Sequence, residues 1–337
     1  MAKKQIKHII ENGDIYFFYR KKMNVERPES VNDLRRMHIV IVPDNNETKR
    51  VYMVGKKRMP IITKGKQTSQ RREWALNVLS NKNPTEIKEE LGPIEYQTKT
   101  RGKRHEPTSI PAAEGRYQIF DHDGHTELAY KIQNPEKESK ALKELQIHKE
   151  ASYIISVKNP DIKIRGFNQK NPNYPKELKN KFAGKRWINI DDPHFLDYEN
   201  TQLLLIGARD NLNDLDLKIK GKANLFKNLK LEKKNWPTET LETGKFTTEY
   251  KEKEPSKPRS SRTKGGERGG KKALKTSSAA GIAKTIKGIN FPAQKKDLIN
   301  YAKDKHANNE IINTLKQMPD KKYNTMADVE KKVGEVR

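Results

Sequence analysis

A basic segment of 23 residues, Pro255–Ser277, divides the chain and most constrains how it can fold. Eight of its residues are Lys or Arg and one is Glu, and Ser, Gly and Pro supply most of the rest. A segment with so little apolar surface cannot offset the chain entropy that folding would remove. We therefore predict a disordered basic linker over residues 255–278, between a folded N-terminal region and a small module at residues 279–336.

The positive charge is not confined to this linker. The 337 residues carry 70 Lys and Arg against 44 Asp and Glu, a net charge of +26. Residues 1–254 hold +14 of that charge, the linker +7 and the remaining residues +5. An excess of this size repels itself unless an anionic partner neutralises it. The distribution favours nucleic acid as the partner, with an anionic membrane or an acidic protein as the alternatives.

Other features exclude several classes of protein. The chain has no cysteine, which excludes disulfides, thiolate nucleophiles, iron–sulfur clusters and zinc sites built on cysteine. Its longest apolar run, Leu203–Ala208, is far shorter than the ~20 residues of a membrane helix. No secretory signal is evident in Met1–Gly13. We expect a cytoplasmic protein without a cofactor or membrane association, located at the nucleoid or the ribosome.

Short runs of Val, Ile, Tyr and Phe bounded by turn residues predict strands in the N-terminal region. The predicted strands are Ile15–Arg20, Met37–Val42, Arg50–Val54, Glu73–Leu79, Tyr117–Phe120, Thr126–Ile132, Ser152–Val157 and Gln202–Ile206. Asp123-Gly124 predicts a two-residue type I′ turn, which pairs Ile119 with Leu128 and Tyr117 with Tyr130 on one face.

Helix signals occur between these strands. Helices are predicted at Pro84–Leu91, Glu138–Leu145 and Pro175–Phe182 from their prolines, caps and apolar spacing. Strands and helices follow one another without a strict βαβ rhythm. We therefore predict a flexible N-terminus at residues 1–12 and an α+β domain of short, mostly antiparallel strands over residues 13–210. A division of this domain near residues 100–115 stays open, as does the structure of residues 211–254.

The C-terminal module is predicted to be all-helical. Its helices are expected at Ile282–Ile286, Pro292–Lys305, Asn309–Met318 and Met326–Val333, with Asn290 and Thr325 at N-cap positions. Its core is predicted to contain Leu298, Ile299, Ala302, Ile311, Ile312, Leu315, Val329 and Val333.

Several motifs in the N-terminal region suggest a relationship with other proteins. They are Gly13–Arg20 (GDIYFFYR), Val54–Pro60 (VGKKRMP), Thr98–His105 (TKTRGKRH), Leu128–Tyr130, Ser156–Pro160, Leu196–Glu199 and Leu203–Ala208 (LLLIGA). With these motifs, residues 13–210 resemble a bacterial and archaeal family of uncharacterised proteins. The resemblance supports the domain boundaries and implies no activity.

A second resemblance involves the C-terminal module. Its motifs are Lys287–Pro292 (KGINFP), Asp297–Ile299, Leu315–Asp320 (LKQMPD), Tyr323 and Ala327–Val329. These residues are similar to a small helical domain of unknown function, although Met318-Pro319 stands where that domain usually has Leu-Pro. This resemblance also implies no activity.

Basic residues of the folded region are the main candidates for binding nucleic acid. They are Lys56, Lys57 and Arg58 at the end of one strand, Arg71 and Arg72 before another, and Lys99, Arg101, Lys103 and Arg104 in a loop. Arginine and lysine side chains suit phosphate geometry, so convergence of these loops would form a cleft for a nucleic-acid backbone. Separate, solvated loops are the alternative.

The linker provides a second set of candidates. They are Lys257, Arg259, Arg262, Lys264, Arg268, Lys271 and Lys272. Such a segment binds phosphates through counterion release without reading base sequence. A tether that touches nothing is the alternative.

Aromatic and histidine residues form two further patterns. The strand residues Tyr16–Tyr19 are all aromatic, and we expect core packing rather than stacking on bases. His122 and His125 flank the Asp-Gly turn, which places their Cβ atoms within roughly 5 Å. An exposed polar hairpin tip explains this pair equally, so we assign no catalytic residue and no metal ligand.

We predict a non-enzymatic protein that binds nucleic-acid phosphates through a folded basic surface and the linker. One alternative is a metal-assisted nuclease or phosphoesterase that uses His122 and His125, with His105 and the basic loop at residues 99–105. Another is an adaptor that docks a ribosome or a repair complex through residues 279–336. The sequence leaves open whether DNA or RNA is the ligand.

Overall fold

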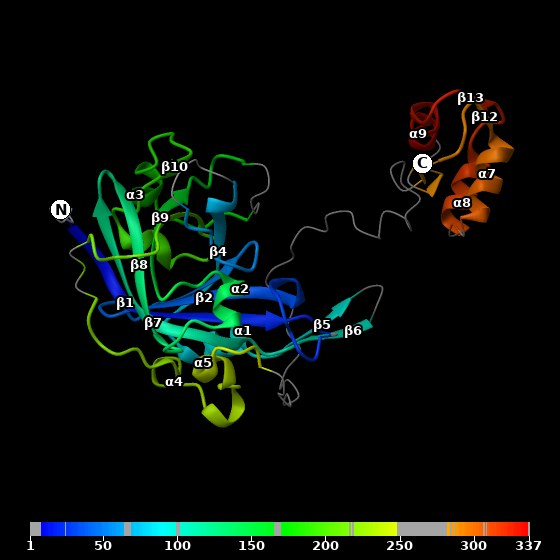
Figure 1. Cartoon of the computed structure of the whole chain (residues 1–337). Coiled ribbons are helices and arrows are strands. Elements are labelled where there is room, and N and C mark those ends of the chain that lie inside the picture. Colours follow the sequence, from blue (N-terminus) through cyan, green and yellow to red (C-terminus); the bar gives the residue numbers. More distant parts are fainter. Residues whose placement is uncertain are drawn as a thin grey trace. The chain divides into compact units, whose positions relative to one another are not determined.

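The chain consists of two units, Met1–Thr263 and Lys264–Arg337, which we describe separately (Figure 1). The computed structural model describes residues 8–23, 25–63, 69–98, 102–164, 170–215, 217, 219–247, 282–283, 285–286, 288–305, 307 and 309–335. The predicted linker at residues 255–278 lies outside this described part of the chain.

Eight antiparallel strands close into a barrel in the N-terminal unit. They are β1 (His8–Lys21), β2 (Leu34–Pro43), β3 (Lys49–Val54), β4 (Arg72–Asn81), β7 (Ile110–His122), β8 (His125–Asn134), β9 (Glu150–Lys158) and β11 (Gln202–Arg209). Their order is β1-β2-β3-β4-β11-β9-β8-β7, and β7 pairs with β1 again. A short strand, β10 (Trp187–Ile188), pairs antiparallel with the end of β9. Each predicted strand lies within one of the eight, so the predicted antiparallel architecture is confirmed.

Strand β1 is buried on both faces, which explains its unbroken run of aromatic residues. Ile15, Phe17 and Tyr19 belong to the core inside the barrel. Tyr16 and Phe18 point outward into a second core. Because successive side chains alternate between faces, a strand covered on both sides has to be apolar throughout. Tyr16 to Tyr19 are all fully buried, so the expected core packing is confirmed.

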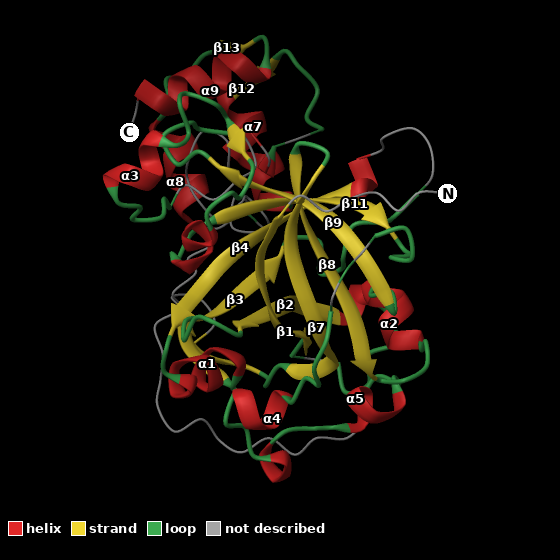
Figure 2. Ribbon diagram, turned by 90° about the vertical axis from the view of Figure 1, so that its left-hand side faces the viewer, coloured by secondary structure: helices red, strands yellow, loops and turns green. Residues whose placement is uncertain are grey.

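The second core lies between the outer face of the barrel and the elements that cover it. These include α1 (Pro84–Leu91) and α4 (Leu225–Asn228), together with Trp236. Helix α1 has the predicted bounds, with Asn83 as its N-cap. In Figure 2, α4 lies between α1 and α5 (Glu239–Thr243) at the lower end of the barrel. Residues 211–247 therefore include a docked covering layer rather than an independent extension.

Shorter elements complete the unit. They are the helices α2 (Lys140–Leu145) and α3 (Lys176–Asn180) and the 3₁₀ turns η1 (Val31–Asp33), η2 (Ser69–Arg71), η3 (Pro193–Asp197) and η4 (Lys233–Asn235). Side chains of α2 and α3 enter the inner core. No helix in the described part of the chain combines the length and the apolar character that crossing a membrane requires.

The β7–β8 hairpin has the predicted register. Ile119 is opposite Leu128, and Tyr117 is opposite Tyr130. Asp123 and Gly124 have φ angles of 48° and 81°. Two positive φ angles define the type I′ turn, so this prediction is confirmed.

Two sequence predictions are wrong, and one open question is answered. Residues 8–12, predicted as a flexible N-terminus, begin β1 and pair with β7. Residues predicted as a loop form a second hairpin of β5 (Ile94–Thr98) and β6 (Gly102–Glu106). The division left open near residues 100–115 does not occur, because the β7 strand that follows pairs with both β1 and β8 and Met1–Thr263 form one unit.

Among its described residues, the C-terminal unit contains three longer helices, a two-stranded pairing and helical residues at 282, 283 and 285, within the predicted helix Ile282–Ile286. The elements are β12 (Ala293–Gln294), α7 (Lys295–Asp304), α8 (Asn309–Gln317), β13 (Lys322–Tyr323) and α9 (Met326–Glu335). Six predicted core residues are fully buried, namely Leu298, Ala302, Ile311, Leu315, Val329 and Val333. Ile299 and Ile312 are half-buried.

Of the two predicted N-caps of this unit, one is confirmed and one is wrong. Thr325 accepts a hydrogen bond from the backbone nitrogen of Asp328 at 3.2 Å, as an N-cap does. Asn290 is not an N-cap, because the chain first forms β12 and α7 begins only after Gln294. The strands β12 and β13 also make the unit less purely helical than predicted.

Candidate functional site

A pocket of about 280 Å³ lies at the end of the barrel where β1 and β3 end and β2 and β4 begin. It is lined by Lys22, Leu34, Arg35, Arg36, Met53, Val54, Gly55, Lys57 and Trp74. These described lining residues include four cations and one indole but no carboxylate. Ligand pockets typically measure ~300–1,000 Å³, so this one suits a phosphate group or a single base. We refer to it as the basic pocket.

The antiparallel register brings these residues together from four segments of the chain. Arg20 is opposite Arg36, and the backbone nitrogen of Lys22 donates to the carbonyl of Asp33. On the neighbouring strands, the backbone nitrogen of Gly55 donates to the carbonyl of Trp74 at 3.0 Å. A Cβ atom on Gly55 would lie 2.4 Å from Cε2 of Trp74, so only glycine lets the indole lie this close to the backbone.

Lys57 is held in the basic pocket by neutral groups. Its Nζ donates to the carbonyls of Leu34 at 2.9 Å and Val31 at 3.1 Å. Burial and the charges of Lys22 and Arg35 lower its pKa. Its backbone is left-handed, with φ at 63°, a conformation that costs a non-glycine residue roughly 1–2 kcal/mol. Both hydrogen-bond acceptors of Lys57 are uncharged carbonyls, so they do not neutralise its positive charge in the pocket.

Two arginines of the pocket share a carboxylate with a third. Glu106 lies 3.5 Å from Nη1 of Arg20, 3.5 Å from Nε of Arg35 and 3.5 Å from Nη2 of Arg36. These separations exceed the ~2.7–2.9 Å of strong charge-assisted hydrogen bonds. The four side chains together carry a charge of +2. An anion in the basic pocket would therefore meet guanidinium groups that one carboxylate only partly neutralises.

Arg20 is the structural member of this group. It is fully buried, and its Nη2 donates to the carbonyls of Glu90 at 2.9 Å and Gly92 at 3.1 Å. Those carbonyls lie at the C-terminus of α1, where a cation also interacts favourably with the helix dipole. Its Nε donates to Oγ of Ser109 at 3.2 Å. Arg20 thereby joins β1 to α1 and to the chain entering β7.

His38 lies beside these arginines and is also buried. Its Nδ1 is 3.5 Å from Oγ of Ser109. Burial, then the charges of Arg20 and Arg36, lowers the pKa of His38 well below its ordinary value. The imidazole is therefore neutral at pH 7.

The sequence-predicted basic residues converge only in part. Lys57 lines the basic pocket, whereas Arg58 is half-buried outside its lining. Lys56 is exposed, and its Nζ lies 3.3 Å from the buried Glu73 and 3.3 Å from the carbonyl of Arg72. Arg71 donates to the carbonyl of Gly207 at 2.9 Å. The segments at residues 56–58 and 71–72 therefore meet at this end of the barrel.

The other predicted basic residues do not belong to the described lining of the basic pocket. Lys103 and Arg104 lie in β6, whereas Lys99, Arg101 and the linker cations fall outside the described residues. Sequence reasoning missed Lys22, Arg35 and Arg36. The only signal was that Lys21-Lys22 and Arg35-Arg36 stand at the ends of predicted strands. Without the strand register, nothing in the sequence joins these pairs to Lys57.

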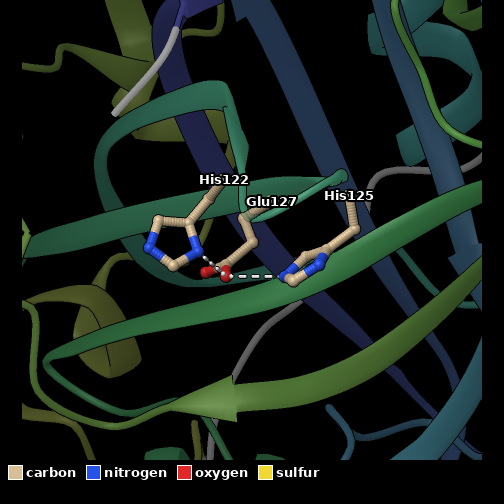
Figure 3. A group of neighbouring side chains, drawn as sticks. All are labelled: His122, His125 and Glu127. Atoms are coloured by element: carbon tan, nitrogen blue, oxygen red, sulfur yellow. Dashed lines mark hydrogen bonds and ion pairs between the residues drawn. The ribbon is translucent and has the colours of Figure 1, made fainter. Parts of the chain in front are cut away.

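A second group of side chains lies at the β7–β8 turn (Figure 3). Oε1 of Glu127 is 3.4 Å from Nδ1 of His122 and 3.2 Å from Nε2 of His125. Nη1 of Arg209 contacts both Glu127 oxygens, at 2.6 and 2.5 Å. His122 and Glu127 are fully buried, and the side chain of His125 is 31% exposed. The interpretation as an exposed hairpin tip is therefore wrong for His122.

The structure does not bring together all the histidines of the predicted nuclease alternative. Strand β7 begins at Ile110, close to the β5–β6 hairpin, and ends at His122. Its 13 residues span roughly 40 Å at ~3.3 Å per residue. His105 in β6 and the His122–His125 pair therefore lie toward opposite ends of this strand.

Comparison with known proteins identifies one family. A family model described as "Protein of unknown function (DUF2795)" matches residues 277–330. This match fits the resemblance of the C-terminal unit to a small domain of unknown function. No curated protein and no solved structure matches the chain. The resemblance of residues 13–210 to an uncharacterised family stays a prediction.

The first prediction separates the roles of the arginines around Glu106. We expect Arg20→Met to lower the free energy of unfolding by about 3–5 kcal/mol, because it removes the buried partner of a buried carboxylate. Arg35→Met is the matched control, since its side chain is 54% exposed and contacts the same carboxylate. It should cost less than about 1 kcal/mol. Urea unfolding measures both, and equal losses would contradict the assigned roles.

The second prediction concerns acid stability. His38 is neutral when folded but protonates in the unfolded chain below its ordinary pKa, so stability falls as pH decreases below about 6.5. This contribution approaches about 1.4 kcal/mol per pH unit. We expect His38→Gln to lose less stability between pH 7 and pH 5 than the wild type, as measured by urea unfolding. His194→Gln, at an exposed histidine, is the control. Identical pH profiles of the wild type and His38→Gln would refute the prediction.

Proposed function

We propose that the N-terminal barrel binds the phosphate backbone of nucleic acid at the basic pocket, without catalysing a reaction. The observation that carries this proposal is the lining of the pocket by Lys22, Arg35, Arg36 and Lys57 around Trp74. Guanidinium groups suit the geometry of phosphate oxygens, and an indole offers a face for a base.

Charge outside the pocket favours a polymer over a small anion. Lys56 and Arg72 are exposed at the same end of the barrel, where they can contact neighbouring phosphates. When a cation of the protein neutralises a phosphate, counterions are released from the nucleic acid. Each further contact of this kind therefore increases the affinity of the protein for the polymer. A small anion gains nothing from cations that it does not reach.

The remaining cations fit the same proposal. The eight Lys and Arg of residues 255–277 would add contacts that do not depend on base sequence. Because they are joined to the barrel, their effective concentration near a bound strand is high. The C-terminal unit would provide a further contact, to nucleic acid or to a protein partner, at the nucleoid or the ribosome.

Trp74 favours single strands as the ligand. It is half-buried in the wall of a pocket small enough for one base. Stacking on an aromatic side chain requires an unpaired base, which a duplex does not offer. We therefore propose single-stranded RNA or DNA as the preferred form.

The third prediction tests the pocket through Lys57→Gly. This variant removes the cation and also relieves the left-handed backbone conformation, so its effect on binding is not explained by strain. Fluorescence anisotropy with a labelled oligonucleotide, at several salt concentrations, measures the result. We expect weaker binding, and the slope of log K against log salt should fall by about 1 in magnitude.

Lys230→Gly is the matched control for this variant. Lys230 is exposed and also left-handed, with φ at 49°, but it does not line the basic pocket. It should bind as the wild type does. Unchanged binding in Lys57→Gly, or an equal loss in both variants, would refute the proposed interface.

The fourth prediction tests the preference for single strands. Trp74→Leu should weaken binding of single-stranded oligonucleotides by the equivalent of about 1–3 kcal/mol, the contribution of one stacked base. Duplex binding should change much less. The ratio of the two affinities is the readout, because partial loss of folded protein lowers both together. Trp187→Leu, in β10, is the control, and an unchanged ratio in Trp74→Leu would show that no base stacks there.

A further inference from the structure

We infer that His122, His125 and Glu127 form a binding site for Zn²⁺. The ligand atoms that these three side chains offer all lie within 4.8 Å of one another. The site is separate from the basic pocket, which its residues do not line. The inference is therefore independent of the proposed binding of nucleic acid.

Two of the three separations between the ligand atoms match those around tetrahedral zinc, and the third is within 4.8 Å. Bonds of ~2.0–2.2 Å to imidazole nitrogen and carboxylate oxygen place neighbouring ligands about 3.4 Å apart. The observed separations from Oε1 of Glu127 are 3.4 Å to His122 Nδ1 and 3.2 Å to His125 Nε2. Figure 3 shows both rings directed at this one carboxylate. An ion can therefore replace the two histidine–carboxylate contacts with little movement of the backbone.

The hairpin explains why the three side chains share one face. His122 and His125 are opposite each other across the type I′ turn. Glu127 is two residues beyond His125 on β8, so its side chain points to the same side of the sheet. Phe120 and Ala129 lie on this face too, where Leu212 and Leu215 cover them. The sheet and its apolar cover therefore hold the group in place before any ion binds.

Arg209 positions the carboxylate. Its Nη1 contacts both oxygens of Glu127 from β11, which fixes the orientation of the carboxylate as outer partners of metal ligands commonly do. The carboxylate oxygens retain lone pairs for a metal ion. The positive charge of Arg209 opposes a second cation, so we expect weaker binding than at a carboxylate without an arginine.

The donor set indicates which ion binds. Two imidazoles suit zinc, copper and nickel, whereas Mg²⁺ and Ca²⁺ prefer oxygen ligands. Three protein ligands leave a fourth position for water. Asp123 is close to the three ligand residues: its Oδ2 lies 3.6 Å from Nδ1 of His122, and its side chain is exposed at the turn. An ion would therefore enter from the turn, past the partly exposed His125.

Isothermal titration calorimetry tests the inference on the full chain after treatment with a chelator. We expect one Zn²⁺ per wild-type chain and no such binding of Mg²⁺. His125→Ala should lose the stoichiometric binding, and circular dichroism checks that it folds. If it fails to fold, His125→Gln serves instead, since it keeps a polar side chain at the partly exposed position.

His194→Ala is the matched control. His194 Nδ1 lies 2.7 Å from Asp192, so this site has one histidine and one carboxylate without a second imidazole. It should bind Zn²⁺ as the wild type does. Co²⁺ provides a second readout, because tetrahedral coordination gives intense visible absorption that His125→Ala should abolish.

Two outcomes would overturn the inference. One is the absence of stoichiometric Zn²⁺ binding in the wild type, which would leave the group as a structural hydrogen-bonded cluster. The other is undiminished affinity in His125→Ala, which would place bound zinc elsewhere. Lys57→Gly should bind Zn²⁺ normally, so failure of the zinc site and failure of the nucleic-acid interface are distinguishable.

Discussion

Closure of the sheet is the constraint on which the rest of the N-terminal unit depends. Each of the eight strands pairs with a neighbour on both sides, and the pairing of β7 with β1 closes the strand order into a ring. A closed ring leaves no open edge among these strands. Within the ring, the antiparallel pairing of β1 with β2, β2 with β3 and β3 with β4 places the ends of β1 and β3 beside the starts of β2 and β4. This register holds together the four segments that line the basic pocket.

Two buried arginines of the unit are compensated in different ways. Arg50 is fully buried and forms a bidentate pair with Glu11 at 2.7 and 2.9 Å, with Asp197 at 2.7 Å from its Nε. Arg20 instead meets helix carbonyls and a carboxylate that two other arginines share. Buried charges are stable only when partners compensate them. Arg50 is therefore a structural residue, whereas the group around Glu106 combines a structural arginine with cations that face a pocket.

Local sequence signals predicted the strands and the β7–β8 hairpin, but not the sites. The Asp123-Gly124 turn fixed the register because its two residues adopt the φ angles that a type I′ turn requires. No such signal marked β5 and β6, whose residues are mostly polar, so Lys103 and Arg104 were assigned to a loop. Glu127 was missed as a neighbour of His122, although the predicted hairpin register places it on the same face as both histidines. What the sequence does not show is that Leu212 and Leu215 cover this face, because contacts between residues so distant in sequence leave no local pattern.

The position of the cations, rather than the total charge, carries the argument for function. A net charge of +14 over residues 1–254 is compatible with many evenly solvated surfaces. Where carboxylates accompany the basic residues, as at Arg50, the local field is weak and the contribution is to stability. The described lining of the basic pocket has four cations and no carboxylate, and Glu106 only partly compensates Arg35 and Arg36. Lys57 meets the uncharged carbonyls of Val31 and Leu34, in a left-handed backbone conformation. This uncompensated charge is the observation that supports the proposal of an anion in the pocket.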